Sequence, residues 1–137
     1  MAQQLLANWA SVTYSRAMLT KPIAVAETAL FIRQAAEVWT EEERVAFIDF
    51  IARNPHAGDL VRETGGVRKV RWARQGGGKR GGVRVVYYYH DAEIPLFLLM
   101  VYAKNRQENL SAAERKAVRA MTTALKRRDR GRERRAI

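Results

Sequence analysis

The sequence predicts a single α+β domain, and three observations lead to this fold class. The length of 137 residues suits one hydrophobic core. Helix-capping patterns at Thr40 and Ser111 each precede a stretch in which apolar residues recur with the helical period. Two segments between them, 67–73 and 83–90, alternate with the period of two that strands require. Helices and strands are therefore both expected, in separate parts of the chain.

Two helices are expected in the first half of the domain. Ile23–Glu27 is interpreted as a short strand, and Thr28 as the cap of the helix that follows. The apolar residues of this helix are Leu30, Phe31, Ala35 and Val38. In the next helix the Thr40 hydroxyl can accept from the third amide while Glu43 reaches back, which is a capping box. Pro55 then ends this helix.

A glycine-rich stretch, GGGKRG at 76–81, connects the two alternating segments. It satisfies G-x-G-x-x-G, but a dinucleotide fingerprint needs a helix after it, whose N-terminus holds the pyrophosphate. It also lacks the Ser or Thr after Lys79 that a P-loop requires. We interpret it as a flexible hairpin connection whose cations, Lys79 and Arg80, could contact phosphate.

The second half of the domain ends with one more strand and one more helix. Leu96–Tyr102 is almost wholly apolar, as expected of a strand buried on both sides. Ser111 and Glu114 form the second capping box, which opens a helix. The apolar stripe of that helix consists of Val118, Met121 and Leu125.

The net charge of +11 is concentrated in two places. Residues 67–84 contain seven Lys or Arg and no acid, and residues 126–137 contain seven against two acids. Such a charge predicts a polyanionic partner, either nucleic acid or an acidic protein. We divide the chain into an N-terminal appendage (1–22) that can be disordered, a domain (23–125), and a basic tail (126–137) that is a frayed helix end or a disordered arm.

Composition excludes several classes of protein. The chain has no cysteine, so a disulfide scaffold, a thiolate zinc site and a Cys nucleophile are excluded. This also suits a reducing compartment, and a cytoplasmic location is expected. No apolar run is long enough to span a membrane, so no membrane partner is expected.

If the two alternating segments pair, Lys69, Arg71 and Arg84 come within reach of one another. Cations gathered without acids repel one another, which favours a bound phosphate over a purely structural role. Cleavage of RNA needs a base, charge stabilisation at phosphorus and an acid. His56 is interpreted as incidental and His90 as a structural residue at the end of a strand, but a lysine can serve where neighbouring cations lower its pKa. The tyrosines that could stack on bases are Tyr87, Tyr88, Tyr89 and Tyr102.

Three segments resemble the RelE/HigB toxins of bacterial type II toxin–antitoxin systems. They read GGVRKVRWA, GKRGGVRVVYYY and LLMVYAKNRQENLSAAE, in the order of that family. The resemblance implies a small α+β fold with two N-terminal helices on a curved antiparallel sheet and a helix at the C-terminus. It also implies ribosome-dependent cleavage of mRNA without metal or other cofactor. The implied partners are mRNA, the ribosome and a cognate antitoxin, for which we expect a helix-turn-helix protein of the HigA type.

The resemblance also assigns site residues. Lys69 and Arg71 match the paired cations of one strand of the family, and Arg84 matches the arginine that opens the next strand. Where the RelE branch has a catalytic tyrosine, Leu110 and Ser111 stand near the position, so Tyr102 is our substitute. The expected catalytic residues are Lys69, Arg71, Arg84, Tyr102 and Lys104. The expected RNA-binding residues are Arg68, Arg74, Lys79, Arg80 and Arg106.

Two other functions remain open from the sequence. One is a ParE-like toxin that inhibits DNA gyrase on the same fold, for which the three cations would not be needed together. The other is a non-catalytic RNA-binding protein, which the composition alone would favour.

Overall fold

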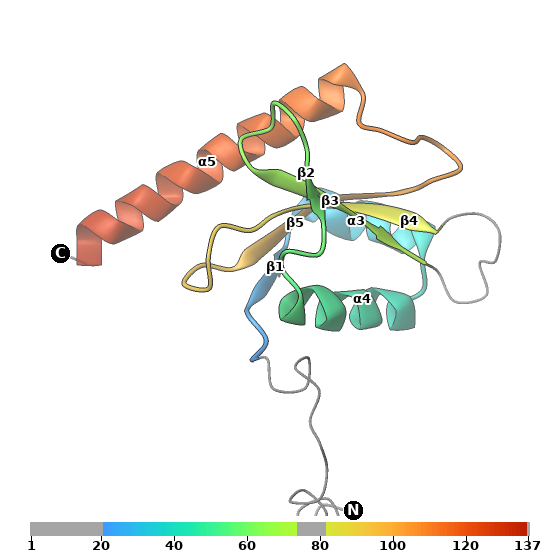
Figure 1. Cartoon of the computed structure of the whole chain (residues 1–137), viewed down its shortest axis with the longest axis horizontal. Coiled ribbons are helices and arrows are strands. Elements are labelled where there is room, and N and C mark those ends of the chain that lie inside the picture. Colours follow the sequence, from blue (N-terminus) through green and yellow to red (C-terminus); the bar gives the residue numbers. More distant parts are fainter. Residues whose placement is uncertain (1–20, 74–81, 137) are drawn as a thin grey trace, which may run out of the picture.

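The computed structural model describes residues 21–73 and 82–136 of the chain. The first twenty residues of the predicted appendage and the glycine-rich stretch 76–81 lie outside this part. Within these residues, three helices are arranged around one sheet (Figure 1). The elements in order are β1 (Val25–Glu27), α3 (Ala29–Val38), α4 (Glu41–Arg53), β2 (Asp59–Leu60), β3 (Val67–Trp72), β4 (Val83–Tyr88), β5 (Leu96–Ala103) and α5 (Ala112–Ala136).

The five strands form one sheet in the order β1-β5-β4-β3-β2. The pairs β2–β3, β3–β4 and β4–β5 are antiparallel, whereas β1 pairs with β5 in parallel. The predicted α+β class is confirmed, with a parallel edge strand added to the antiparallel part. The pairing Trp72↔Val83 also confirms that the glycine-rich stretch lies between two antiparallel strands.

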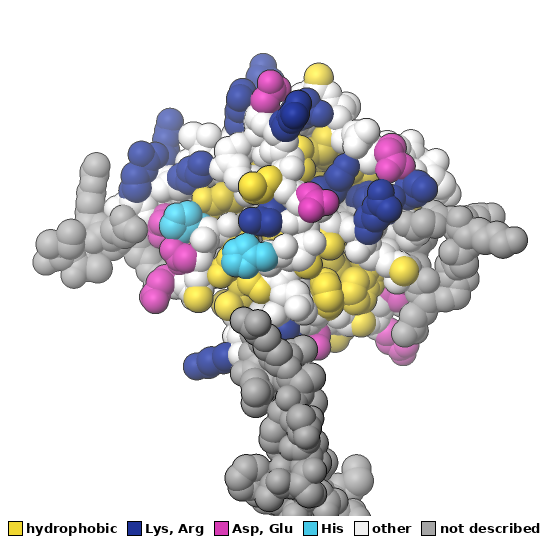
Figure 2. All heavy atoms as spheres, in the orientation of Figure 1, with side chains coloured by type: hydrophobic (Ala, Val, Ile, Leu, Met, Phe, Trp, Pro, Cys, Tyr) yellow, Lys and Arg dark blue, Asp and Glu magenta, His cyan; other side chains and the backbone are white. Residues whose placement is uncertain are grey.

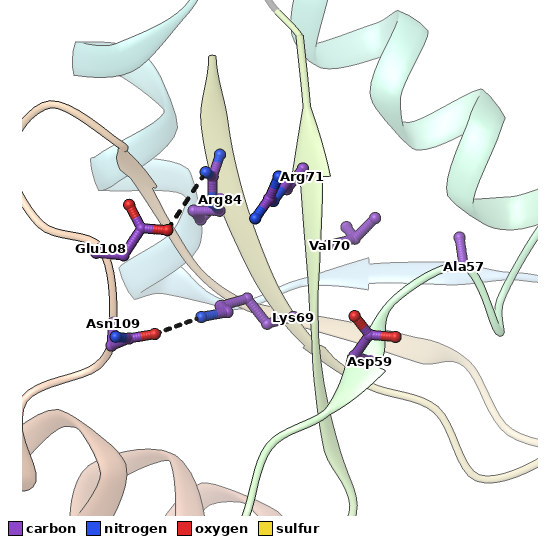
Figure 3. Close-up of a pocket in the computed structure, with 8 residues that line it drawn as sticks. All are labelled: Ala57, Asp59, Lys69, Val70, Arg71, Arg84, Glu108 and Asn109. Carbon is purple, nitrogen blue, oxygen red and sulfur yellow. Dashed lines mark hydrogen bonds and ion pairs between the residues drawn. The ribbon is translucent and has the colours of Figure 1, made fainter. Parts of the chain in front are cut away.

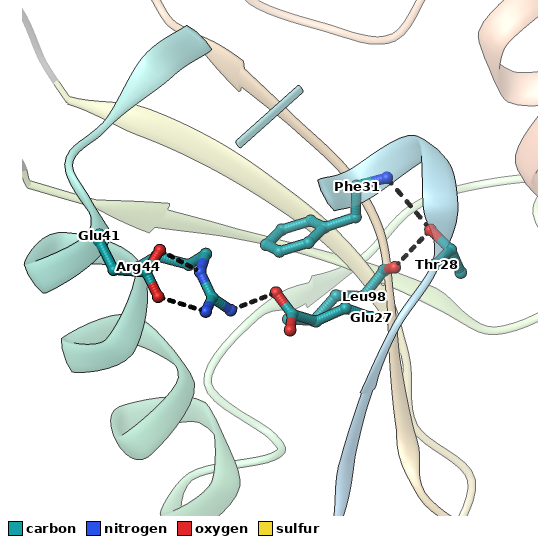
Figure 4. Close-up of polar contacts among 6 residues, drawn as sticks. All are labelled: Glu27, Thr28, Phe31, Glu41, Arg44 and Leu98. Carbon is teal, nitrogen blue, oxygen red and sulfur yellow. Dashed lines mark hydrogen bonds and ion pairs between the residues drawn. The ribbon is translucent and has the colours of Figure 1, made fainter. Parts of the chain in front are cut away.

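Both N-terminal helices begin at the predicted caps. The Thr28 hydroxyl accepts from the Phe31 amide at 3.2 Å and donates to the Leu98 carbonyl of β5 at 2.8 Å (Figure 4). Thr40 and Glu43 form the predicted capping box, with both reciprocal bonds at 3.2 Å. These caps satisfy amides that have no partner inside the helix, and the Thr28 cap also fixes α3 to the sheet.

An ion-paired arginine connects α4 to the edge of the sheet. The guanidinium of Arg44 contacts Glu41 in its own helix and Glu27 of β1, each at 2.5 Å (Figure 4). These carboxylates raise the pKa of Arg44, and the largest cause is the hydrogen bonding that Arg44 donates to Glu41. The contact holds the first strand beside α4.

Each face of the sheet carries its own apolar cluster. Side chains of α3 and α4, among them Phe31, Phe47 and Ile51, pack on one face against alternate residues of β3, β4 and β5. On the other face, Val118 of α5 and Leu110 pack against a second set of strand residues. The sheet therefore separates two cores, and α5 covers only part of the second face.

The predicted capping box of the last helix is also present. The Ser111 amide donates to Glu114 at 2.9 Å, and the Glu114 amide donates to the Ser111 hydroxyl at 3.1 Å. Helix α5 continues to Ala136, through most of the segment that the charge distribution set apart as a basic tail. Lys126 in this helix donates to the Gly65 carbonyl at 2.8 Å, which ties α5 to the loop between β2 and β3.

Candidate phosphate-binding site

Strand register places the predicted cations on one face of the sheet. Arg71 of β3 is the direct partner of Arg84 of β4, and Arg84 is in turn the partner of Tyr102 of β5. Lys69 lies two residues before Arg71 and therefore shares its face. This is the face that α5 partly covers, so the cations lie on its uncovered part.

These cations line a pocket of about 490 Å³ (Figure 3). Its walls come from β2, β3, β4, the turn before β2 and the loop that joins β5 to α5. The lining residues are Ala57, Asp59, Lys69, Val70, Arg71, Arg84, Glu108 and Asn109.

Arg84 is almost completely buried, with 2% of its side chain exposed. It belongs to a strand in which all six residues are buried. Burying a guanidinium is costly unless a partner offsets the lost hydration. Here Glu108 Oε1 lies 3.7 Å from its Nη2 atom, and its Nη1 atom donates to the Val83 carbonyl at 3.4 Å. Arg84 therefore lies at the bottom of the pocket, beside the carboxylate of Glu108.

The other two cations are nearer to solvent. Lys69 Nζ donates to Asn109 Oδ1 at 2.9 Å, and Asp59 is the strand partner of Lys69 on β2. Arg71 is exposed. Residues 67–84 contain no acid, but the cation cluster in the folded protein is not free of acids. Asp59 and Glu108 line the same pocket, and both come from outside residues 67–84.

The loop that carries Glu108 and Asn109 is anchored on both sides. Gln107 donates to the Asn109 carbonyl at 3.1 Å and to Glu114 of α5 at 2.9 Å. Leu110 is buried in the second core. Glu108 therefore sits between two fixed points and not at the tip of a free loop.

Tyr102 lies beneath this loop. Its side chain is 6% exposed, and its hydroxyl donates to the Glu108 carbonyl at 3.5 Å. Burial raises the pKa of Tyr102, and the nearby charge of Arg84 opposes this effect. The tyrosine is not among the pocket-lining residues, so it supports the loop in this structure.

The remaining predicted residues lie elsewhere or outside the described part. Arg68 points to the opposite face from Lys69 and donates to the Gly58 carbonyl at 2.7 Å. Lys104 and Arg106 are exposed in the turn after β5 and do not line the pocket. The three residues outside the described part are Arg74, Lys79 and Arg80.

Both histidines lie away from the pocket. His56 packs edge-on against Tyr89, with ring centroids 5.2 Å apart. His90 Nδ1 lies 2.6 Å from a carboxylate oxygen of Asp91. Neither histidine lines the pocket.

Glycine at position 58 shapes the wall of the pocket. Its amide donates to the Tyr87 hydroxyl at 2.8 Å, and that hydroxyl donates to the Pro55 carbonyl at 2.8 Å. A Cβ atom at Gly58 would lie 2.9 Å from both the Lys69 carbonyl oxygen and the Tyr87 ring. Only glycine lets this turn lie directly on β3, where it places Ala57 and Asp59 in the pocket wall.

We expect Gly58→Ala to lower the free energy of unfolding by about 1–3 kcal/mol, because backbone must move to admit the methyl group. Urea denaturation of both proteins measures this difference. Gly131→Ala is the matched control, since a Cβ there meets no atom within 4 Å and alanine favours helix. An unchanged stability of Gly58→Ala would contradict the close packing of this turn.

The face of the molecule seen in Figure 2 is not uniformly basic. Figure 2 shows Lys and Arg side chains over the upper part of the visible face, with acidic side chains among them and hydrophobic ones gathered below. If the pocket binds an anion, the local arrangement of its cations therefore matters more than a general positive field.

Within residues 21–73 and 82–136, no three His, Asp or Glu side chains gather as metal ligands. No described helix is both long and apolar enough to span a membrane.

Sequence reasoning missed Asp59, Glu108 and Asn109. Glu108 and Asn109 lie between the predicted buried strand and a predicted helix cap. A loop in that position has to return along the end of the sheet, where the strand cations lie. That spacing was the available signal for Glu108 and Asn109, whereas nothing local marks Asp59.

The chain is similar to known proteins in sequence and in structure. The model of a family described as RelE toxin of the RelE/RelB toxin–antitoxin system matches residues 25–134. Among solved structures, the chain is similar to a mutant of the E. coli toxin RelE in the free state, with 14% sequence identity and a TM-score of 0.46. That match covers 64% of this chain and 90% of the other. The family match spans most of the chain and includes every residue of the pocket.

Proposed function

The chain belongs to the RelE family of toxins from toxin–antitoxin systems, and from this premise we propose that it is a ribosome-dependent mRNA endonuclease that inhibits translation. The observation that carries the proposal is the pocket in which Lys69, Arg71 and Arg84 meet. Three cations from two paired strands suit a phosphodiester, whose charge increases during cleavage.

The proposed reaction uses the 2′-hydroxyl next to the scissile phosphate as the nucleophile. Negative charge builds on the non-bridging oxygens when this hydroxyl attacks phosphorus. Fixed cations stabilise that charge more strongly than the charge of the ground state, which is the condition for catalysis. The products are a 2′,3′-cyclic phosphate and a 5′-hydroxyl end, and no metal or cofactor takes part.

A toxin of this family has a cognate antitoxin as its partner. We propose that the antitoxin is a helix-turn-helix protein of HigA type and that the ribosome presents the mRNA. Lys104 and Arg106, exposed after β5, and Arg68 are proposed to contact RNA at a distance from the reacting phosphate. Arg74, Lys79 and Arg80 are also proposed to contact RNA. Their joint effect is on affinity, since phosphate contacts of this kind are additive and sensitive to salt.

Two experiments test the proposal. The first measures bacterial growth when the chain is expressed, and the second measures cleavage of a message in a reconstituted translation system. We expect growth arrest, and cleavage of a translated message but not of the same message without ribosomes. A message with a single 2′-deoxynucleotide at the cleavage position should stay intact. Co-expression of the antitoxin should restore growth.

Three outcomes would contradict the proposal. Arrest of DNA supercoiling with intact messages would indicate a gyrase inhibitor. Ribosome or RNA binding without cleavage would indicate a binding protein. Normal growth of cells that contain the folded, soluble chain would show that the chain is not toxic to them.

A further inference from the structure

We propose that the Glu108 carboxylate is the general base that takes the proton from the attacking 2′-hydroxyl. This inference rests on the proposed nuclease function and names the group that function leaves open. It arises from a feature that phosphate binding alone does not explain. A carboxylate in the wall of a phosphate pocket repels the ligand, yet Glu108 lies 3.7 Å from the guanidinium of the most buried cation.

The position of Glu108 relative to Arg84 suits a base. The 2′-oxygen is joined to the scissile phosphorus through only two carbons and the 3′-oxygen, so its base must lie beside the cation that holds that phosphate. Figure 3 shows Glu108 next to Arg84 on one side of the pocket, whereas Asp59 lies across β3 on the other side. Of the two acids that line the pocket among the described residues, Glu108 is the one with this placement.

Glu108 is also accessible and fixed at the same time. Its side chain is 54% exposed, so a ribose can reach it, whereas Arg84 beneath is 2% exposed. The backbone of Glu108 accepts from the Tyr102 hydroxyl, and its neighbours Gln107 and Asn109 are held by hydrogen bonds. A base that is positioned before the substrate binds loses little entropy in the reaction.

The other side chains near the pocket are less suited to accept a proton. Lys69 Nζ donates to Asn109 Oδ1, so this nitrogen is already engaged as a hydrogen-bond donor. The Tyr102 hydroxyl is buried, and burial raises its pKa, which keeps it protonated. Arginine stays charged at any working pH. The carboxylate is therefore the acceptor that this pocket offers.

The step balances without any further reactant. The 2′-hydroxyl proton moves to Glu108 while the 2′-oxygen forms a bond to phosphorus. The bond between phosphorus and the 5′-oxygen breaks, and the leaving oxygen takes a proton from the Lys69 ammonium. Arg71 and Arg84 stabilise the charge on the non-bridging oxygens. Proton exchange with water then restores both groups: Glu108 loses the proton that it gained, and Lys69 regains the proton that it lost.

The test is single-turnover cleavage of ribosome-bound mRNA by the full chain and its Glu108→Gln variant. Glutamine keeps the size of the side chain and an oxygen that can accept from Arg84, but it cannot act as a base. We expect the rate to fall by about 10²-fold or more. The affinity for ribosomes should stay the same or rise slightly, because a negative charge has been removed.

Two further variants keep the result unambiguous. Glu93→Gln makes the same change of charge at an exposed position in the loop between β4 and β5, and it should cleave like the wild type. Glu108→Asp retains a carboxylate on a shorter stem, and it should cleave at least about tenfold faster than Glu108→Gln. Thermal melts of each variant verify the fold.

The possible failures are distinguishable. If Glu108→Gln cleaves within about threefold of the wild type, or no more slowly than Glu108→Asp, Glu108 is not the base and the nuclease function still stands. If the wild type itself does not cleave ribosome-bound mRNA, the proposed function fails first.

Discussion

Replacement of Arg84 by alanine is expected to slow single-turnover cleavage of ribosome-bound mRNA by about 10²-fold or more. The guanidinium lies at the bottom of the pocket, between its strand partners Arg71 and Tyr102 and beside Glu108. Its removal takes away charge stabilisation that matters most in the transition state. Ribosome affinity should change less, since many other cations of the chain contribute to it.

Because Arg84 is buried, its replacement can also change the stability of the protein, so this experiment needs a control for folding. On the sequence alone, removal of one cation from a like-charged cluster would relieve repulsion and leave folding intact. In the structure the side chain fills space in a fully buried strand and is paired with Glu108, so alanine should also cost stability, by about 1–3 kcal/mol. Thermal melts are therefore needed beside every rate.

Two variants of Arg84 separate charge from packing. Arg84→Met fills most of the space without a charge, and it should fold better than Arg84→Ala while cleaving as slowly. Arg84→Lys should recover part of the rate, because an ammonium lacks the planar fork of the guanidinium. A folded Arg84→Met protein that cleaves at the rate of the wild type would mean that Arg84 is structural and that the reacting phosphate binds elsewhere.

Replacement of Phe47 by alanine is expected to lower the free energy of unfolding by about 3–5 kcal/mol. Phe47 is completely buried in the core between the helices and the sheet. Its ring lies 5.5 Å from that of Trp39 and 5.4 Å from that of Trp72, measured between centroids. Truncation leaves a cavity that these rigid rings cannot fill, and the loss is a large share of the stability of a small domain.

Urea denaturation of Phe47→Ala and Val45→Ala measures this effect against a matched control. Val45 lies on the same helix with 53% of its surface exposed, and its truncation should change stability by no more than about 0.5 kcal/mol. Equal stabilities for the two variants would mean that α4 does not pack as described. Loss of toxicity in Phe47→Ala would reflect folding, since this residue does not line the pocket.

The local features of the fold were predictable because they depend on neighbours in sequence. Thr40 and Ser111 cap helices by bonds that span three residues, and both capping boxes are present. The alternation at Lys69 and Arg71 placed both on one face, and the apolar run of β5 predicted a strand buried on both sides. Pairing of two alternating segments then brought Arg84 beside Arg71.

The parts that sequence could not supply depend on contacts between distant segments. Counting charges within 67–84 gave no acid, but Glu108 enters the pocket from a loop 24 positions after Arg84. An arginine in a β-branched strand looks exposed by alternation, yet the loop above it buries Arg84 almost completely. The close approach of Gly58 to the Lys69 carbonyl is likewise a property of the assembled sheet.

The parallel pairing of β1 with β5 determines when the protein can fold during its own synthesis. The strand 25–27 has its partners at 96–98, and the Thr28 cap reaches the Leu98 carbonyl across 70 residues of chain. Contacts of such long range form late, since the loop between them has to close first. A nascent chain cannot complete the sheet until β5 has left the ribosome, and Glu108 and Asn109 emerge later still. Chains that terminate before the loop of Glu108 and Asn109 should consequently be inert, because they lack part of the sheet and of the pocket.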